Sequence, residues 1–333
     1  MTPYERVKCR LEGKEVDKIP NMNIAMALVA KEAGTDYRTY VQDYRKLVEG
    51  NLRCVEKYGF DSVSVISDPI REAAAFGSNL IFPQDGVPYC SEPLLKNGYD
   101  TDKLKIVSPY DNERTLDRIR AVEEFRIRVG GEIPIIGWVE GVLAECADLR
   151  GVSELLMDLA EEEDLTEVMD IIFRQQCRFI EAQVKAGADI IGIGNAVASL
   201  VGPSLYEEYA FKYDKATIDY VHQMGAKAKL HICGNITPLL SQLKLLEADI
   251  LDFDWMVECR DIRDITEGTS VCICGNMDPV AVMLQGTEKD VAEKTDTCIQ
   301  EGGKRYLAAC GCEVSKDSPE NNLKAMDDVL YMK

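Results

Sequence analysis

Eight short apolar segments, rich in β-branched residues, alternate with longer amphipathic stretches along this chain of 333 residues. Repeated strand–helix units predict a parallel sheet, because parallel neighbours need a long crossover connection, usually a helix. Eight such units predict a (β/α)8 TIM barrel, an α/β fold, in a single domain over residues 1–333. The predicted strands are Ile19–Ile24, Ser62–Ser67, Ile133–Val139, Ile190–Gly194, Lys227–His231, Ile250–Asp254, Ser270–Cys274 and Tyr306–Ala309.

The predicted helices lie between most of these strands. They cover Tyr40–Lys57, Glu113–Val129, Val152–Ala160, Leu165–Ala186, Leu205–Met224, Ile236–Leu246 and Glu288–Glu301. A doubly wound open sheet is the alternative, but no Gly-x-Gly-x-x-Gly turn follows the first strand, which weakens a dinucleotide-binding interpretation. Residues 76–104, rich in Pro, Gly and Asp, are expected to form an extended loop or hairpin over the barrel mouth after strand two.

Composition excludes several classes of function. The formal net charge of −20 argues against binding to nucleic acid or an anionic membrane, because both need basic patches. No apolar run is long enough for a transmembrane helix, and Met1–Lys8 lacks the apolar core of a secretory signal, so we expect a cytoplasmic protein. The twelve cysteines are scattered rather than arranged as a dense disulfide framework, which predicts reduced thiols and suits an anaerobic setting.

A His-x-Cys segment, His231-Ile232-Cys233, is followed much later by a second cysteine pair, Cys310 and Cys312. Residues i and i+2 of a strand point the same way, so His231 and Cys233 can reach one ion. A third thiolate from a distant strand end, Cys312 with Cys310 as the alternative, would leave one tetrahedral position open. Such a position is typical of a catalytic zinc site rather than a structural one. The alternative is a buried histidine among core cysteines.

Polar side chains follow nearly every predicted strand, where barrel enzymes place their chemistry. Three are predicted to be catalytic: Glu140, Asn195 and Asp254. Of these, Glu140 and Asp254 are expected to handle protons or to complete the metal shell. Four more are predicted to bind the cofactor or substrate in the pocket: Asp68, Asn235, Asn276 and Tyr206. The alternative for these residues is a helix cap, a solvated loop position or ordinary packing.

Four motifs occur in order: His231-Ile232-Cys233-Gly234-Asn235, Cys274-Gly275-Asn276-Met277-Asp278-Pro279, Gly311-Cys312-Glu313 and Ser318-Pro319-Glu320-Asn321. Asp68-Pro69 and Ser199-Leu200-Val201-Gly202-Pro203 are weaker matches. Together they resemble the uroporphyrinogen decarboxylase superfamily and, within it, the zinc-dependent corrinoid methyltransferase branch. The resemblance implies a (β/α)8 barrel over the whole chain and a Zn2+ ion bound by His231, Cys233 and Cys312.

True decarboxylases of this superfamily carry an arginine-rich segment near the N-terminus that grips propionate groups. The matching region here, Lys18–Met26, contains no arginine. Decarboxylation is therefore disfavoured, because a cleft for a polycarboxylate needs a basic clamp. The methyltransferase branch implies a corrinoid. With only two histidines and no segment typical of a carried cobamide, the chain is expected to receive the corrinoid from a partner protein at the barrel mouth.

Two chemistries suit zinc at such a site. We favour transfer of a methyl group from a methoxylated aromatic to a reduced corrinoid, an O-demethylation in which the metal stabilises the leaving anion. The alternative is transfer from a methylcorrinoid to a thiol that the metal activates. A sulfonated thiol such as coenzyme M needs a basic contact, for which Arg71 and the pair Lys304 and Arg305 are the candidates. A non-catalytic barrel that keeps zinc for stability is a further alternative.

Overall fold

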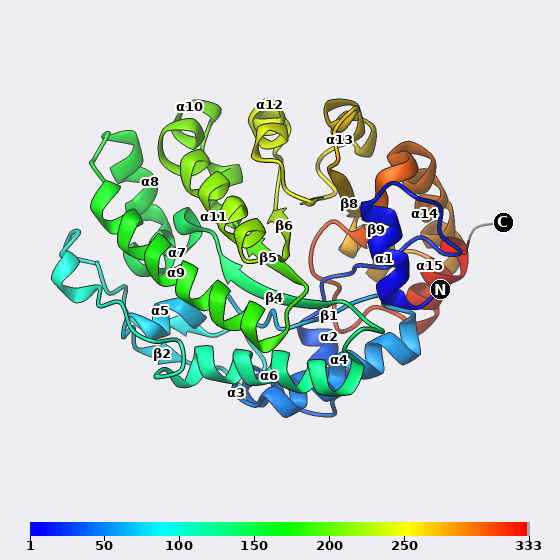
Figure 1. Cartoon of the computed structure of the whole chain (residues 1–333), viewed down its shortest axis with the longest axis horizontal. Coiled ribbons are helices and arrows are strands. Elements are labelled where there is room, and N and C mark those ends of the chain that lie inside the picture. Colours follow the sequence, from blue (N-terminus) through cyan, green and yellow to red (C-terminus); the bar gives the residue numbers. More distant parts are fainter. Residues whose placement is uncertain (332–333) are drawn as a thin grey trace.

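Within the described residues 1–331, seven parallel strands form one curled sheet at the centre of the computed structural model (Figure 1). Residues 332 and 333, the last two of the predicted domain, lie outside the described part. The sheet order follows the chain and confirms the predicted parallel α/β architecture. The strands are β1 (Val63–Ser64), β4 (Ile135–Glu140), β5 (Ile190–Gly194), β6 (Lys227–Ile232), β7 (Ile250–Phe253), β8 (Cys272–Met277) and β9 (Tyr306–Cys310).

The predicted first strand, Ile19–Ile24, is not a regular strand in the structure. Single backbone hydrogen bonds link this segment to both sides of the sheet. Met22 N donates to a carbonyl of β9 at 2.8 Å, and Asp61 N, just before β1, donates to Asn21 O at 2.8 Å. Pro20 has no amide hydrogen, so the ladder on this segment stays short.

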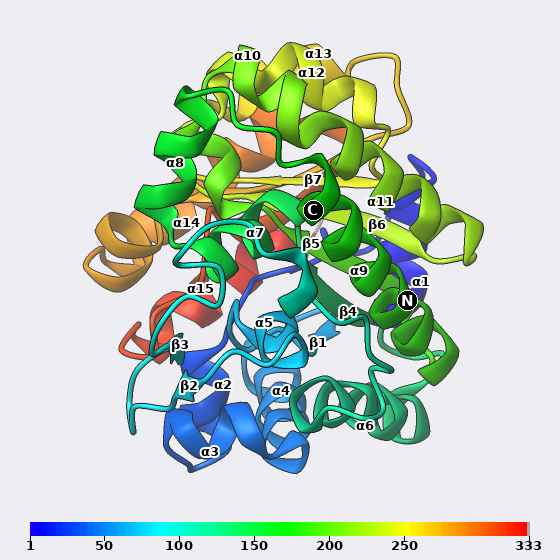
Figure 2. The ribbon, with the colours of Figure 1, turned by 90° about the vertical axis from the view of Figure 1, so that its left-hand side faces the viewer.

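Helices surround the sheet on its outer side (Figures 1 and 2). Those longer than eight residues are α1 (Pro3–Leu11), α4 (Tyr44–Tyr58), α6 (Glu113–Val129), α7 (Val142–Arg150), α8 (Val152–Ala160), α9 (Thr166–Ala186), α11 (Phe211–Gln223), α14 (Glu288–Gly302) and α15 (Glu320–Leu330). The shorter ones are α2 (Ala27–Glu32), α3 (Tyr37–Gln42), α5 (Arg71–Ala75), α10 (Pro203–Leu205), α12 (Leu240–Leu243) and α13 (Cys259–Thr266).

Two predicted helices are interrupted. The one expected over Tyr40–Lys57 divides into α3 and α4 at Asp43, whose backbone is extended and whose side chain accepts a hydrogen bond from Arg45 N. A side chain that satisfies a free amide in this way caps a new helix. The one expected over Ile236–Leu246 is a series of short turns around α12. Between β1 and α6, the strands β2 (Leu80–Ile81) and β3 (Tyr89–Cys90) pair antiparallel.

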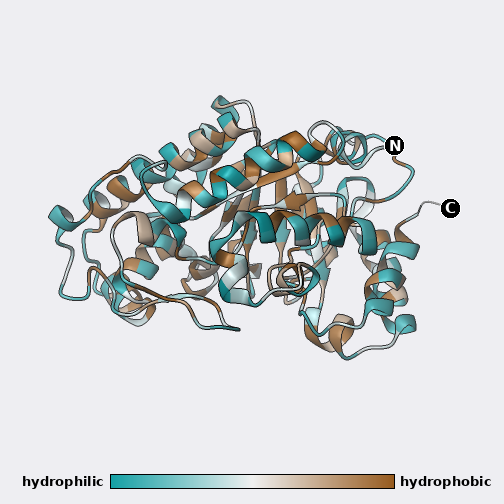
Figure 3. Ribbon diagram, turned by 90° about the horizontal axis from the view of Figure 1, so that it is seen from below, coloured by the Kyte–Doolittle hydropathy of each residue, from teal (hydrophilic) through white to brown (hydrophobic). Residues whose placement is uncertain are grey.

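The apolar core lies between the sheet and the helices. In Figure 3 the central strands are largely brown, which marks hydrophobic residues, whereas the outer helices carry much teal. None of the described helices has the length and apolar character needed to cross a membrane. Four neighbouring strands bring Gly194, His231, Asp252 and Cys274 side by side in register. Because parallel strands end at the same edge of the sheet, the loops that follow these residues meet there.

Candidate metal centre

One imidazole and two thiols converge beyond the carboxyl ends of β6 and β9. The ligand atoms of His231, Cys233 and Cys312 all lie within 4.8 Å of one another. His231 Nε2 is 2.9 Å from Cys233 Sγ, which is 3.5 Å from Cys312 Sγ. Cys310, the alternative third ligand, is buried at the end of β9 and does not belong to this group.

Asp254, just after β7, holds the loop that carries Cys233 and packs beside the loop that carries Cys312. Its Oδ2 accepts a hydrogen bond from Gly234 N at 2.7 Å, which fixes the turn directly after Cys233. Gly234 itself has a φ of +84°, a conformation that favours glycine. On the other side, a Cβ at Gly311 would lie 2.2 Å from Trp255 N, so only glycine fits directly before Cys312.

His231 is oriented by Asp252, its register partner on β7. The ring Nδ1 lies 3.2 Å from Asp252 Oδ2, and both side chains are buried. Burial lowers the pKa of His231, but the neighbouring carboxylate outweighs this effect and raises it to about 10. The arrangement directs Nε2 toward the thiols, as expected for a metal-binding histidine supported by a carboxylate.

The two thiols share one proton unequally. The hydrogen bond from Cys233, together with His231, lowers the pKa of Cys312 to about 4, although burial opposes the shift. The same hydrogen bond and burial raise the pKa of Cys233 above its usual range. A thiolate is therefore already favoured at Cys312, and thiolates are the form in which cysteine binds metals.

This donor set fits a soft divalent ion. Zinc takes sulfur at about 2.3 Å and imidazole nitrogen at about 2.0 to 2.1 Å in tetrahedral sites, which requires donors roughly 3.5 Å apart. The spacing of the two sulfurs meets that requirement, and the spacing of His231 Nε2 and Cys233 Sγ would have to widen by about half an ångström. Three protein ligands leave a fourth position for a substrate, the pattern of catalytic rather than structural zinc sites.

A cavity of about 140 Å³ opens beside these three residues. Its lining is largely apolar and includes Trp138, whose ring centroid is 6.5 Å from that of His231. The remaining lining residues are Ile24, Met26, Ile66, Asp68, Pro69, Val87, Glu140, Gly194, Ala196 and Glu313. A substrate bound here would contact mostly apolar side chains while one end faces the thiols.

Two predicted residues, Asp68 and Glu140, line this cavity. Asp68 pairs with Arg114, which together with Arg71 holds the pKa of this carboxyl below its usual range despite burial. Glu140 lies 2.8 Å from the Arg71 guanidinium and accepts a hydrogen bond from Trp138 Nε1 at 3.2 Å. Burial nevertheless raises the pKa of Glu140 to about 8.

The other five predicted residues do not line this cavity in the described part of the chain. Their contacts give each of them another role or none in the site. Asp254 holds the loop after Cys233, as described above. Asn195 and Tyr206 both donate to the buried carboxylate of Asp214, at 2.8 to 3.0 Å. Asn235 is exposed and its side chain accepts from Thr237 N. Asn276 is buried and donates to Val257 O.

The basic residues that were expected to bind the sulfonate group of a thiol substrate also lie outside the cavity. Arg71 is fully buried and donates to Asp68 O and Glu140. Lys304 and Arg305 precede β9 and therefore lie at the opposite, amino end of the strands, where Arg305 donates to Leu11 O and Ser270 O.

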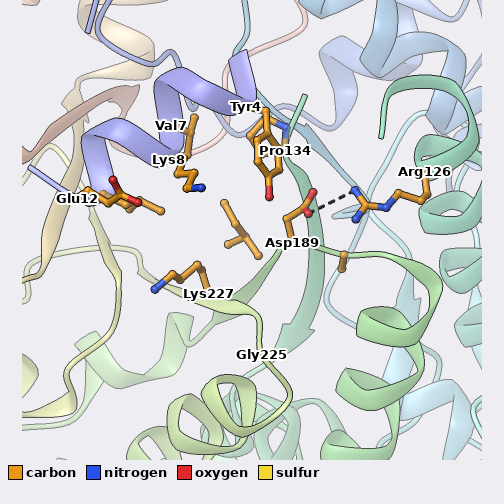
Figure 4. A pocket seen from close by; sticks show the side chains of 12 residues that line it. Tyr4, Val7, Lys8, Glu12, Arg126, Pro134, Asp189, Gly225 and Lys227 are labelled. Carbon is orange, nitrogen blue, oxygen red and sulfur yellow. Dashed lines mark hydrogen bonds and ion pairs between the residues drawn. The ribbon is translucent and has the colours of Figure 1, made fainter. Parts of the chain in front are cut away.

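A larger hollow of about 410 Å³ lies at that amino end, between α1 and the starts of β5 and β6 (Figure 4). Two of its basic residues are paired with carboxylates: Arg126 lies 3.4 Å from Asp189, and Lys227 lies 2.8 Å from Asp249. Parallel barrels carry their chemistry at the carboxyl ends of the strands, so we place the candidate site at the smaller cavity.

Two residues of the site were not predicted from the sequence. Asp252 lies two residues before Asp254 on the predicted strand, so the period-2 alternation of a strand could have placed both on one face. Glu313 belongs to the Gly311-Cys312-Glu313 motif, but no local pattern shows that its side chain turns into the cavity.

Known proteins resemble this chain over nearly its whole length. A family model described as "Uroporphyrinogen decarboxylase (URO-D)" matches residues 2–331. The chain is 28% identical to the methylcobamide:CoM methyltransferase MtbA of Methanosarcina acetivorans, over 98% of this chain and 96% of that protein. It is 22% identical to the uroporphyrinogen decarboxylase of Carboxydothermus hydrogenoformans, over 85% and 82%.

A solved structure, a methyltransferase from Methanosarcina mazei, superimposes with a TM-score of 0.89 at 21% identity, over 99% of this chain and 98% of that one. This likeness supports the barrel-like fold. The family match confirms the resemblance predicted from the motifs. The chain therefore belongs to the uroporphyrinogen decarboxylase family.

Proposed function

We propose that this protein is a zinc-dependent methyltransferase that moves a methyl group from the corrinoid of a partner protein to the sulfur of a small thiol. The proposal depends on one observation above all: His231, Cys233 and Cys312 converge beside a largely apolar cavity at the carboxyl ends of the strands. Relatives named as methylcobamide:CoM methyltransferases, which match nearly the whole chain, support both the corrinoid and the thiol.

The expected methoxylated aromatic donor receives no support from these relatives, whose names favour the thiol alternative. Decarboxylation stays disfavoured, although decarboxylases are also relatives. No lysine or arginine occurs among the residues that line the cavity in the described chain. A substrate with several carboxylates would therefore have no basic clamp.

A zinc ion held by the three ligands would lower the pKa of a thiol that enters the fourth position. The chain itself provides the surroundings for that thiol. Apolar side chains such as Ile24 and Ile66 exclude water, which leaves the sulfur weakly solvated and more reactive. Glu140, with a pKa of about 8, can hold or release a proton in the cavity near neutral pH.

We also propose that the segment Ile19–Ile24 acts as an eighth strand and closes the sheet into a complete (β/α)8 barrel. The backbone hydrogen bonds of Met22 and Asn21 to both sides of the sheet support this closure. In that arrangement the metal ligands surround the open end of the barrel, where the corrinoid of a partner would have to enter.

The test is anaerobic incubation with methylcob(III)alamin as a free methylcorrinoid and 2-mercaptoethanol as a neutral thiol. We expect zinc-dependent loss of the methylcobalamin absorbance and formation of the methyl thioether, identified by mass spectrometry. Cys312→Ala should abolish both signals, whereas Cys177→Ala on α9, away from the site, should retain them. The proposal fails if the thiol is not methylated while cob(I)alamin and phenyl methyl ethers yield methylcobalamin.

A further inference from the structure

The carboxylates around the cavity differ in how their charge is balanced. Asp68 pairs with Arg114, and Glu140 lies 2.8 Å from Arg71. Both arginines are buried, and their guanidinium groups are engaged by these carboxylates and by backbone carbonyls. These cations therefore neutralise the wall of the cavity but are not free to bind an anionic substrate.

Glu313 is the lining carboxylate without a cationic partner in the described residues. Its Oε1 accepts hydrogen bonds from Met26 N at 3.1 Å and Ala27 N at 2.7 Å. Among residues 1–331, its other oxygen, Oε2, has no hydrogen-bond partner, and this oxygen is not fully buried. One carboxylate oxygen thus anchors the side chain to the start of α2, and the other stays available at the cavity.

The same contacts remove the donors that an anion would use. The amides of Met26 and Ala27 are already occupied by Glu313. No lysine or arginine lines the cavity in the described part of the chain, and His231 is committed to the metal. A sulfonate or carboxylate on the substrate would face Glu313 without compensation, and juxtaposed like charges strongly disfavour binding.

Building on the proposed function, we propose that Glu313 selects short thiols that carry a positively charged amino group, and that it rejects anionic thiols. Glu313 follows Cys312 directly, and both side chains line the cavity. Because that cavity has a volume of only about 140 Å³, the amino group of a short thiol whose sulfur approaches Cys312 can reach the free oxygen of Glu313.

The reaction with such a thiol balances without a further reagent. The sulfur attacks the methyl carbon of the methylcob(III)alamin, a C–S bond forms and the Co–C bond breaks. The electron pair of that bond stays on cobalt, giving cob(I)alamin, and the thiol proton passes to the solvent. The amino group takes no part in bond changes, so its charge affects selection rather than the chemical step.

Three thiols of the form HS–CH2–CH2–X test the proposal on the wild-type protein, where X is an ammonium, a hydroxyl or a sulfonate group. With methylcob(III)alamin as donor, we expect kcat/KM to be highest for cysteamine, intermediate for 2-mercaptoethanol and lowest for 2-mercaptoethanesulfonate. Cysteamine should exceed the sulfonate by at least about tenfold, because charge-assisted hydrogen bonds are the stronger ones. A preference for the sulfonate overturns the proposal.

Glu313→Gln keeps an oxygen that can accept from Met26 N and Ala27 N, so α2 should stay anchored while the charge is lost. We expect the ratio of kcat/KM for cysteamine to that for 2-mercaptoethanesulfonate to fall by about tenfold. Asp317→Asn removes one charge from the same loop but lies outside the cavity lining, and should leave the ratio as it is. An unchanged ratio in Glu313→Gln contradicts the role of this residue.

A binding measurement separates this proposal from the proposed function. Calorimetric titration of the zinc-loaded protein with the three S-methyl products does not need turnover. If no thiol is methylated, the proposed function fails, yet tighter binding of the ammonium thioether still supports selection by Glu313. Tighter binding of the sulfonate thioether overturns the selection, even if methyl transfer to thiols is observed.

Discussion

The imidazole Nδ1 of His231 lies 3.2 Å from Oδ2 of Asp252, and the same oxygen lies 2.8 Å from Nζ of Lys229. All three side chains are buried at the level where β6 and β7 pair. One carboxylate therefore serves two purposes. It neutralises a lysine inside the barrel, and it fixes the direction in which the histidine presents Nε2 to the two thiols.

Asp252→Asn should weaken zinc binding by about 10- to 100-fold, the usual effect of removing a carboxylate that supports a metal-binding histidine. The amide keeps the shape of the side chain but loses the charge beside Nδ1. The dissociation constant can be measured by competition with a chromophoric chelator and confirmed by metal analysis of the dialysed protein.

Lys229→Met is the matched control for that variant. It disturbs the same buried ion pair but leaves Asp252 beside His231. Breaking a buried pair destabilises proteins by about 3 to 5 kcal/mol when an uncompensated charge is left, so both variants should unfold at lower urea concentrations. Only Asp252→Asn should lose zinc affinity, and equal losses in both variants would show that Asp252 acts through stability alone.

Cys312→Ala should remove zinc binding without unfolding the protein. Cys312 lies in a loop beyond β9 and is only half-buried, so its thiol contributes little to the core. For the wild type, free zinc at 100 times its dissociation constant should stabilise the fold by about 2.7 kcal/mol. The melting temperature of the wild type should therefore rise with zinc, and that of Cys312→Ala should not.

The zinc-free proteins provide the control for this comparison. Stripped wild type and Cys312→Ala should melt at similar temperatures, because the rest of the sheet and its helices are unchanged. If the stripped wild type unfolds as readily as Cys312→Ala, and zinc restores only the wild type, the site is structural. That outcome would support a barrel that keeps its metal for stability.

Strand–helix alternation was sufficient to predict the sheet and several helices with their bounds. The predicted helices Glu113–Val129 and Val152–Ala160 coincide with α6 and α8. Helix α7 was missed because residues 142–149 are buried on nearly every side, so they lack the amphipathic period by which helices are recognised. Interruptions such as that at Asp43 depend on side-chain caps, which many polar residues can form.

The metal ligands were predictable because few residue types bind soft ions, and only two histidines occur in the chain. The other site residues at strand ends were harder to predict, because the direction of each side chain decides whether it faces the cavity. At the end of β5, Gly194 and Ala196 line the cavity, whereas the side chain of Asn195 between them turns away to Asp214. Sequence shows that a polar residue follows a strand, but the local backbone decides which side it faces.

Tyr206→Phe tests whether Tyr206 stabilises the fold through Asp214 rather than binding a substrate in the cavity. Tyr206 donates to Asp214 Oδ2 at 2.8 Å, and burial raises the pKa of Asp214 to about 6 although this hydrogen bond opposes the shift. Loss of the donor should reduce the free energy of unfolding by about 1 to 2 kcal/mol, because a buried carboxylate loses a partner. KM for the thiol should not change, as Tyr206 does not line the described cavity.

Urea denaturation and steady-state kinetics on the same preparations measure both effects. Tyr110→Phe, at a tyrosine that is about half-exposed, is the control and should change stability by less than about 0.5 kcal/mol. A large rise in KM for Tyr206→Phe, with stability unchanged, would restore the role that the sequence predicted for this residue.

Glu145 on α7 gives a prediction about pH. Its side chain is buried, and both carboxylate oxygens have no hydrogen-bond partner in the described residues. Burial, with the nearby charge of Asp148, raises its pKa well above the usual range, so the folded protein holds a proton there. The unfolded chain releases this proton above the ordinary pKa of about 4.3. Folded protein thus binds more protons than unfolded protein, and the stability contributed at this position falls as pH rises.

Glu145→Met should therefore stabilise the protein, by about 1 to 3 kcal/mol near neutral pH, because an unpaired buried polar group is replaced by an apolar one of similar size. The gain should be larger at pH 8 than at pH 5, because pH 5 lies closer to the ordinary pKa of the unfolded chain and the cost of holding the proton in the folded state is smaller there. Urea denaturation at the two pH values measures the difference. Glu154→Met, at an exposed position on α8, should change stability by less than about 0.5 kcal/mol. A loss of stability in Glu145→Met at pH 8 would contradict this prediction. It would mean that the carboxyl group of Glu145 has a hydrogen-bond partner in solution and stabilises the packing of α7.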